Sequence, residues 1–313
     1  MRALRRAYGL AFIAACIASC ALASTLLSAC SQSANGAGAT SGAAFSPPAT
    51  VVSPTFDDAA AVNGPSCAID ASHVKQGYVA AKGTSPTKLK LQVVSGERSY
   101  NYDIPADGSP VFCPINMGDG PYNFRIMQNT SGSNYVEIAS TSENVTLESE
   151  FAPFLIPNVY CNYSDTSECV SMARQLTADA KTEGDALKAI CTYVEDNIAY
   201  DNTKASALST STGYIPNPDA TLAARSGICF DYASLGCAML RSVGIPCRII
   251  TGYVSPNDIY HAWIMVYIDG TWSTGEFQIE DNEWSRVDLT FAASSNNEGL
   301  VGDGKTYTDR YVY

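Results

Sequence analysis

The chain has 313 residues, of which 46% are hydrophobic and 16% are charged, and its formal net charge is -12. This composition excludes a chain that is disordered throughout, and the length favours two domains with accessory segments over a single small core. A surface this acidic also argues against nucleic acid as a partner, because it would repel phosphate groups.

The first residues, 1–29, are predicted to be a signal peptide that is removed on export. Three arginines among the first six residues precede an uncharged apolar run over 7–29. The run ends in Leu27-Ser28-Ala29-Cys30, which resembles the processing box of bacterial lipoproteins, in which the cysteine is lipidated and becomes the first mature residue. Cys20 ends a similar box, but cleavage there would leave an apolar stub on the mature protein. An ordinary secretory signal and a single membrane anchor are the alternatives.

A flexible linker is predicted for residues 30–66, beginning at the lipidated Cys30. The segment is rich in Ala, Gly, Ser, Thr and Pro and contains no Lys or Arg, which is typical of flexible chain. No later segment approaches the ~18 apolar residues that a transmembrane helix needs. We therefore expect the protein to be held at the cell membrane by lipid alone, with its domains facing outside the cytoplasm.

Residues 67–160 show the period-two alternation of β-strands. Short alternating runs are separated by Gly, Pro, Asn and Asp, a pattern that favours a small antiparallel sandwich. The runs cover residues 88–94, 100–104, 122–128, 134–139 and 144–147. His73 is interpreted as a structural residue of this β-rich domain.

Residues 161–313 are expected to begin with helices. Cap-type residues at 164–166 precede one predicted helix, and apolar residues at three- and four-residue steps predict a second over 185–199. A polar loop is expected over 202–219. The next helix carries Cys229 in its first turn, is apolar on nearly all sides, and is ended by Gly244 and Pro246.

Antiparallel strands are predicted to follow these helices. They are expected over 248–254, 261–268, 271–280 and 283–289, with a two-residue hairpin at Asp269-Gly270. Residues 161–313 are thus predicted to be an α+β domain, a helical layer packed on an antiparallel sheet.

The cysteines are numerous, with eleven in the chain. Disulfides can form outside the cytoplasm, and Cys161 with Cys169 is the pair we expect first, because the two are close in sequence. The cysteines and the two histidines lack the spacing of zinc ligands, so no metal or other cofactor is expected.

Three residues of the α+β domain are predicted to form a catalytic triad. A thiol becomes a good nucleophile as a thiolate, which a helix N-terminus and a neighbouring imidazolium both stabilise. Cys229 lies at a predicted helix N-terminus, and His261 is the histidine of the same domain that can supply the imidazolium. Asp288 ends a strand that can lie beside the strand of His261, where a carboxylate would fix the ring.

The sequence blocks around these residues resemble those of transglutaminase-like proteins, a superfamily with a papain-like cysteine enzyme fold. The resemblance depends on the ordered set, since each block alone is weak. The blocks are Ile198-Ala-Tyr200-Asp201, Gly227-Ile-Cys229, Asp231-Tyr-Ala233, Gly244-Ile-Pro-Cys-Arg248, Gly252-Tyr253, His261-Ala-Trp263 and Trp284-Ser-Arg-Val-Asp288-Leu-Thr290.

The resemblance implies a nucleophile at Cys229, a base at His261 and an orienting carboxylate at Asp288. It also implies that Tyr200 donates its hydroxyl to an oxyanion, with simple packing as the alternative. Trp263 is interpreted as a side chain that shields the imidazole of His261 from water and so keeps it dry.

The sequence departs from the family pattern at Leu289, where Pro is usual, and the segment before Asp288 is longer than in the shortest members. Glu276 is the fallback orienting residue. Asp231 is interpreted as a first-turn carboxylate favoured by the helix dipole.

The function implied by the resemblance is thiol-dependent acyl transfer on amide bonds of proteins or peptides, through a thioester. Water as the second nucleophile makes the enzyme a peptidase or amidase, and a lysine amine makes it a protein-glutamine transglutaminase. The sequence does not choose between them. A non-catalytic surface binding or assembly module built on the same fold is the alternative.

Overall fold

The computed structural model describes residues 39–255, 258–273, 278–293 and 306–313. Cys20, Cys30 and the predicted signal peptide lie outside the described residues, as does the fallback carboxylate Glu276. No helix in the described part of the chain has the length and hydrophobicity that crossing a bilayer requires.

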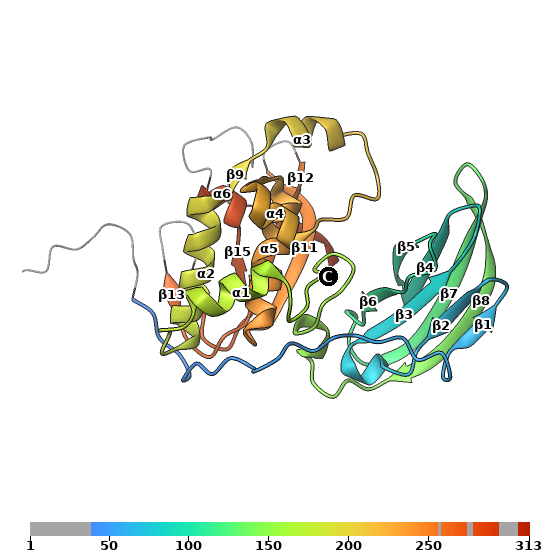
Figure 1. Cartoon of the computed structure of the whole chain (residues 1–313), viewed down its shortest axis with the longest axis horizontal. Coiled ribbons are helices and arrows are strands. Elements are labelled where there is room, and N and C mark those ends of the chain that lie inside the picture. The colour runs from blue at the N-terminus through green and yellow to red at the C-terminus, as the bar shows by residue number, and fades with distance from the viewer. Residues whose placement is uncertain (1–38, 256–257, 274–277, 294–305) are drawn as a thin grey trace, which may run out of the picture. The chain divides into compact units, whose positions relative to one another are not determined.

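Two four-stranded antiparallel sheets form the β-rich part of the chain (Figure 1), with strand orders β1-β2-β3-β6 and β5-β4-β7-β8. Alternate residues of both sheets, such as Val79, Leu91 and Phe124, share one buried core, as expected for a sandwich. The strands are β1 Val62–Gly64, β2 Cys67–Asp70, β3 Tyr78–Gly83, β4 Leu89–Ser95, β5 Arg98–Ile104, β6 Val111–Pro114, β7 Gly120–Ser131 and β8 Asn134–Val145. Short 3-10 helices occupy Val74–Gln76 and Ala152–Phe154.

Strand prediction in this part was incomplete. Strands β2 and β3 were missed because their residues are buried on both faces almost without interruption, which removes the alternating signal. The two runs at 134–139 and 144–147 are one strand, since the polar residues between them continue the ladder to β7.

The helical layer lies in the second half of the chain (Figure 1). Its helices are α1 Glu168–Leu176, α2 Glu183–Asn197, α3 Asn202–Leu208, α4 Pro218–Ala224, α5 Cys229–Ser242 and α6 Leu289–Ala293. Helix α5 is buried from Asp231 to Ser242, as its apolar surface predicted. The polar loop predicted over 202–219 was wrong in part, because Asp201 caps α3 and Asn217 caps α4 through their side chains.

The sheet beside these helices has the order β15-β12-β11-β16 and is antiparallel throughout. Its residues Ile249 and Ile264 share a core with Leu235 and Met239 of α5. The predicted α+β architecture is therefore confirmed. The strands are β11 Cys247–Val254, β12 Ile259–Val266, β15 Ser285–Val287 and β16 Tyr307–Val312, and two short pairs are β9 Ala199–Tyr200 with β10 Ser226–Gly227 and β13 Trp272–Ser273 with β14 Gln278–Ile279.

The hairpin predicted at Asp269-Gly270 was wrong. Strand β12 pairs with β11 and β15, whereas β13 pairs with β14. The Asp269-Gly270 turn is instead covered by the N-terminal strap, our name for residues 40–51. The carbonyl of Asp269 accepts a hydrogen bond from Ala43 N–H at 2.7 Å, and Thr271 accepts one from Ser41 N–H at 3.0 Å.

The N-terminal strap corrects the prediction of a flexible linker through residue 66. A Cβ added to Gly42, which has φ +133°, would lie 2.2 Å from the Asp269 carbonyl, and one added to Gly184 would lie 2.5 Å from the Ser41 carbonyl. The small residues that suggested flexibility therefore serve close backbone contact here. The strap is a packed part of the fold.

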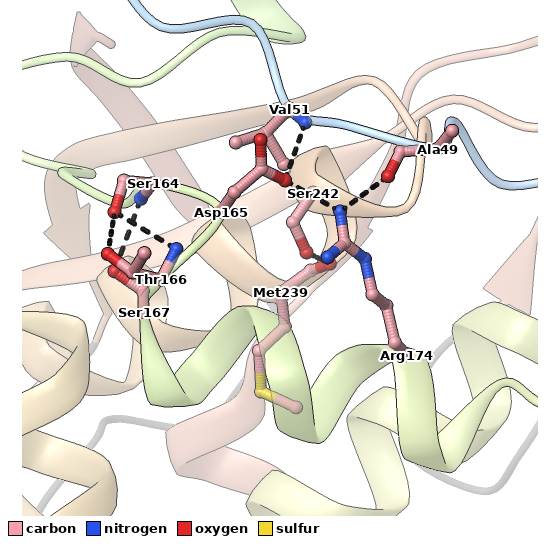
Figure 2. A network of polar contacts seen from close by, with 9 residues as sticks. All are labelled: Ala49, Val51, Ser164, Asp165, Thr166, Ser167, Arg174, Met239 and Ser242. Atoms are coloured by element: carbon pink, nitrogen blue, oxygen red, sulfur yellow. Dashed lines mark hydrogen bonds and ion pairs between the residues drawn. The ribbon is translucent and has the colours of Figure 1, made fainter.

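Figure 2 shows how the end of the strap is fastened to α1. The Asp165 carboxylate accepts a hydrogen bond from Val51 N–H at 3.0 Å. It also forms an ion pair with Arg174 at 2.8 Å. Arg174 also donates to the Ala49 carbonyl at 3.3 Å. The Val51 side chain is buried in the core of the helical half, so this attachment is apolar as well as polar.

The predicted Cys161–Cys169 disulfide was wrong. Both cysteines are free and fully buried, and the Cys161 thiol donates weakly to the Ser234 carbonyl at 3.9 Å. Both belong to the core of the helical half as small buried residues.

Candidate active site

Cys229 is the first residue of α5, directly after β10. The start of the helix is fixed by Asp231, whose buried carboxylate accepts a hydrogen bond from Ile228 N–H at 2.9 Å. The thiol is thus held at a helix N-terminus, where the dipole favours a negative sulfur. The side chain is partly buried, in contrast to the other free cysteines of the described residues, which are buried.

His261 lies on β12 and is 3% exposed. Its Nε2 is 2.8 Å from Oδ2 of Asp288, the residue that follows β15. Strand pairing explains the meeting, because Val287 is opposite Ile264 in the β12–β15 ladder. Asp288 also accepts hydrogen bonds from Phe291 N–H at 3.0 Å and from the Tyr307 hydroxyl at 2.7 Å.

The His261–Asp288 pair stabilises charge on both partners. Burial alone would lower the pKa of His261 from its ordinary 6.5, but the charges of Asp288 and Cys229 and hydrogen bonds to both raise this pKa to about 10. Burial would raise the pKa of Asp288, but the His261 charge and the three hydrogen bonds keep this pKa below its ordinary value. A protonated ring at neutral pH is the partner that a thiolate needs.

Cys229 and His261 line the same cleft, which has a volume of about 600 Å³. The side chain of Cys229 is one of the groups that raise the pKa of His261. Because Nε2 faces Asp288, the nitrogen left for the thiol is Nδ1. His261 thus contacts Asp288 and lines the same cleft as Cys229.

Tyr200 lies on the wall of this cleft. It pairs with Gly227, two residues before Cys229, in the parallel β9–β10 ladder. Burial, with smaller contributions from the charges of Cys229 and Asp231, raises the pKa of Tyr200 to about 12. Its hydroxyl therefore keeps its proton at neutral pH and can donate a hydrogen bond.

Trp263 is 1% exposed, and its ring stacks against that of His261 with centroids 6.1 Å apart. It also makes an edge-to-face contact with Tyr307 at 4.8 Å. Trp263 therefore packs beside the imidazole, and its role in keeping the ring dry stays a prediction.

Three polar contacts of the site were missed from the sequence. Tyr307, on β16, shares Asp288 Oδ2 with His261, and no motif marks it.

The Asp231 carboxylate accepts hydrogen bonds from Lys204 Nζ at 2.6 Å and Tyr214 at 2.5 Å, in addition to capping the helix. It thereby fixes one wall of the cleft. The sequence predicted only its place as a carboxylate in the first turn of the helix.

Among the described residues, no three His, Cys, Asp or Glu side chains are grouped in a way that could hold a metal ion.

The family comparison covers the whole of this row of residues. Residues 170–289 match the family model described as the transglutaminase-like superfamily. This segment is a transglutaminase-like domain. The resemblance first seen in the sequence blocks is thereby confirmed for residues 170–289, which include Cys229, His261 and Asp288.

Two curated relatives match parts of the chain. An uncharacterized protein of Mycobacterium leprae is 31% identical over 96 residues, which is 26% of this chain and 29% of that protein. A UPF0252 protein of Methanocaldococcus jannaschii is 27% identical over 195 residues, which is 59% of this chain and 53% of that protein. The chain thus spans about a third to a half of the length of these relatives.

Solved structures with similarity to this chain share little sequence with it. A candidate cysteine protease from Cytophaga hutchinsonii has 16% identity and a TM-score of 0.34, covering 75% of this chain and 91% of that chain. Red sea bream transglutaminase has 12% identity and a TM-score of 0.29, covering 74% of this chain and 50% of that chain.

Proposed function

We propose that this protein is a thiol-dependent enzyme that acts on amide bonds of proteins or peptides, with Cys229 as nucleophile, His261 as general base and acid, and Asp288 as orienting carboxylate. The observation that carries the proposal is the buried 2.8 Å contact between His261 and Asp288 beside a cysteine at a helix N-terminus. A purely structural core gains nothing from a buried imidazole and carboxylate next to the partly exposed sulfur.

The first half of the reaction forms a thioester. In the resting site His261 already holds the proton of the Cys229 thiol, so the sulfur attacks the amide carbonyl carbon as a thiolate. The oxyanion that forms accepts hydrogen bonds from Cys229 N–H and from the Tyr200 hydroxyl. When the carbon–nitrogen bond breaks, His261 gives its proton to the leaving amine or ammonia.

The second half releases the acyl group. Water or a primary amine attacks the thioester, His261 accepts the proton of that nucleophile, and the sulfur leaves as a thiolate beside the protonated ring. With water the products are those of a peptidase or amidase. With a lysine amine the product is a cross-linked protein.

Iodoacetamide tests whether Cys229 is an activated thiol. We expect Cys229 to react at neutral pH at least about tenfold faster than a thiol in the unfolded chain, because His261 and the helix dipole favour thiolate. The Cys113→Ala variant, which removes a buried thiol of the sandwich, should label at the wild-type rate. A Cys229 that labels no faster than an unfolded thiol favours the binding-module alternative.

A tagged primary amine separates the two reactions. The full mature chain is incubated with a glutamine-containing protein and the tagged amine. Incorporation that is lost in Cys229→Ala supports transfer, and ammonia or peptide fragments without incorporation support hydrolysis. If the wild-type protein forms neither the incorporation product nor the hydrolysis products, the proposal of an enzyme is contradicted.

The site of action is proposed to be outside the cytoplasm, with the protein attached to the membrane through lipid on Cys30. Supporting this are the charged start and apolar run of the N-terminus, which end at that cysteine. The Cys30→Ala variant should move the protein out of the membrane fraction, and Cys20→Ala should leave it there.

A further inference from the structure

The cleft beside Cys229 has an unusual lining for so acidic a protein. The formal net charge of the chain is -12, yet His261 is the one side chain among the lining residues that can carry a positive or negative charge near neutral pH, apart from Cys229 itself. The remaining lining side chains of the described cleft are aromatic, aliphatic or hydroxyl-bearing. The aromatic ones are Tyr160, Tyr200, Tyr214, Phe230, Tyr260 and Tyr313.

These aromatic side chains are held in place by one another and by hydrogen bonds. Tyr160 contacts Phe230 with ring centroids 5.4 Å apart and Tyr313 at 4.6 Å. The Tyr214 hydroxyl is bound to the buried Asp231. The cleft is thus a built surface rather than a chance grouping of mobile rings.

Tyr260 differs from the other rings because it remains open to solvent. It precedes His261 directly, and it is 53% exposed. Its hydroxyl is 3.0 Å from Thr251 Oγ1, and its ring makes an edge contact with Tyr253 at 5.5 Å. An aromatic ring that is fixed at its polar end and exposed over its body is prepared to cover a ligand next to the reacting atoms.

We propose that the cleft selects peptides whose residues beside the reacting amide are uncharged and apolar or aromatic, and that Tyr260 is the residue that determines this preference. The inference rests on the proposed function, since it names the substrate class of the same site. A charged side chain entering the cleft would lose hydration and find no opposite charge among the lining side chains other than the reacting pair. An apolar side chain would gain by covering Tyr260 and Phe230.

A lysine side chain is the informative competitor. Aromatic rings attract ammonium groups by about 0.5–1 kcal/mol at exposed sites. His261 is paired with the Asp288 carboxylate, so this ion pair leaves little net charge to attract either a lysine or a glutamate side chain. Full burial of an apolar side chain is worth about 1.5–3 kcal/mol, which exceeds the attraction of the rings for an ammonium group. We therefore expect a lysine side chain to bind less tightly than phenylalanine or leucine.

Binding to the full mature chain with Cys229→Ser tests the inference without turnover. The probes are four peptides, acetyl-Gly-X-Gln-X-Gly-amide with X as Phe, Leu, Lys or Glu, measured by calorimetry at high salt so that the net charge is screened. We expect the Phe and Leu peptides to bind at least about tenfold more tightly than the Lys and Glu peptides. Equal binding of the Lys and Phe peptides would overturn the proposal.

Two variants at one position give the matched control. Tyr260→Ala, made in the Cys229→Ser chain, should reduce the preference for Phe over Lys to about threefold or less. Tyr260→Phe keeps the ring, loses only the contact with Thr251, and should retain the preference. An unchanged preference in Tyr260→Ala contradicts the role of this residue. Because the side chain is half exposed, neither change is expected to prevent folding, and thermal melting checks this.

Turnover separates failure of the inference from failure of the proposed function. If wild-type protein converts all four peptides at equal kcat/KM, the inference is wrong and the enzyme stands. If the Cys229→Ser chain binds the peptides selectively but wild-type protein converts none, the selectivity stands and the proposed chemistry is wrong.

Discussion

The two halves of the molecule bury polar groups in different ways. In the sandwich, the fully buried carboxylate of Asp70 accepts hydrogen bonds from Asp57 N–H at 2.8 Å and from Ser72 N–H at 2.9 Å. These bonds connect neighbouring chain segments, and the carboxylate also lies 3.8 Å from Nε2 of His73. We interpret Asp70 as a structural residue.

In the transglutaminase-like domain, the buried groups Asp231, His261 and Asp288 lie at or next to one cleft. The buried Arg241 instead donates to backbone carbonyls of the core. Asp231 fixes the start of the nucleophile helix and one wall, and Asp288 fixes the imidazole. Removing charges from water costs several kcal/mol each unless partners compensate. The difference between the halves teaches that the position of buried charge, rather than its presence, marks the site. The predictions below test that difference.

The largest expected effect is on Cys229. Cys229→Ala should reduce kcat/KM by about 10⁴-fold or more, because the covalent step is lost. Cys113→Ala changes a fully buried thiol of the sandwich and should leave kcat/KM within about twofold, with a modest loss of stability. Steady-state kinetics on whichever amide substrate is found measures both. Similar losses of kcat/KM in the two variants would mean that Cys229 has no role in catalysis beyond that of a buried structural cysteine.

Asp288→Asn should lower kcat by about 10²- to 10⁴-fold, because the carboxylate that orients the ring and stabilises its charge is lost. In wild-type protein the ring stays protonated until the pH approaches its pKa of about 10, so activity should fall on the alkaline side only near that pH. Without the Asp288 charge, burial should bring the pKa of His261 down. The alkaline limb of the pH profile should then move to lower pH.

The same pKa has a consequence for stability. A ring whose pKa is raised on folding stabilises the folded state fully below pH 6.5, and this stabilisation is lost as the pH rises toward about 10. The free energy of unfolding of wild-type protein should therefore fall over that range more steeply than that of His261→Gln. Urea denaturation measures this free energy at each pH. If it fell equally with pH in wild-type protein and in His261→Gln, the charged His261–Asp288 pair would be contradicted.

Asp231→Ala and Asp70→Ala compare the two halves directly. Each should destabilise the fold by about 2–4 kcal/mol, because each leaves buried donors without an acceptor. Asp231→Ala should in addition raise KM, since Lys204 and Tyr214 no longer hold the cleft wall. Asp70→Ala should leave KM unchanged in the fraction that remains folded. An equal rise of KM in both would remove the distinction between the halves.

The smallest expected effect is that of Tyr307→Phe. The change removes one hydrogen bond to Asp288 Oδ2, worth about 1 kcal/mol, and keeps the ring against Trp263. We expect kcat to fall about fivefold and the alkaline limb to shift slightly. A change in KM alone would indicate a packing role instead.

The three candidate residues Cys229, His261 and Asp288 could be singled out from the sequence, because each lies in a short local block, at a helix start, on a strand and directly after a strand. The α5 helix was equally readable from its apolar surface. Contacts between distant segments were not. The pairing of Tyr307 with Asp288 and of Lys204 with Asp231 depends on tertiary packing, and neither residue has a local pattern that sets it apart.

The prediction of a linker failed for the same physical reason. Composition indicates how much apolar side-chain surface a segment can bury, and Gly, Ala and Ser have little such surface. The N-terminal strap packs through backbone groups and through the absence of Cβ atoms at Gly42 and Gly184. Such contacts are specified by the surface that the segment meets.

The strap also bears on the order of folding. Its hydrogen bonds join Ser41 and Ala43 to Thr271 and Asp269, more than two hundred residues later in the chain. Contacts between such distant positions require closure of a very long loop and are associated with slow folding. An early segment of a nascent chain must therefore wait for residues near 270 before it finds its place, which favours folding after most of the polypeptide has been synthesised.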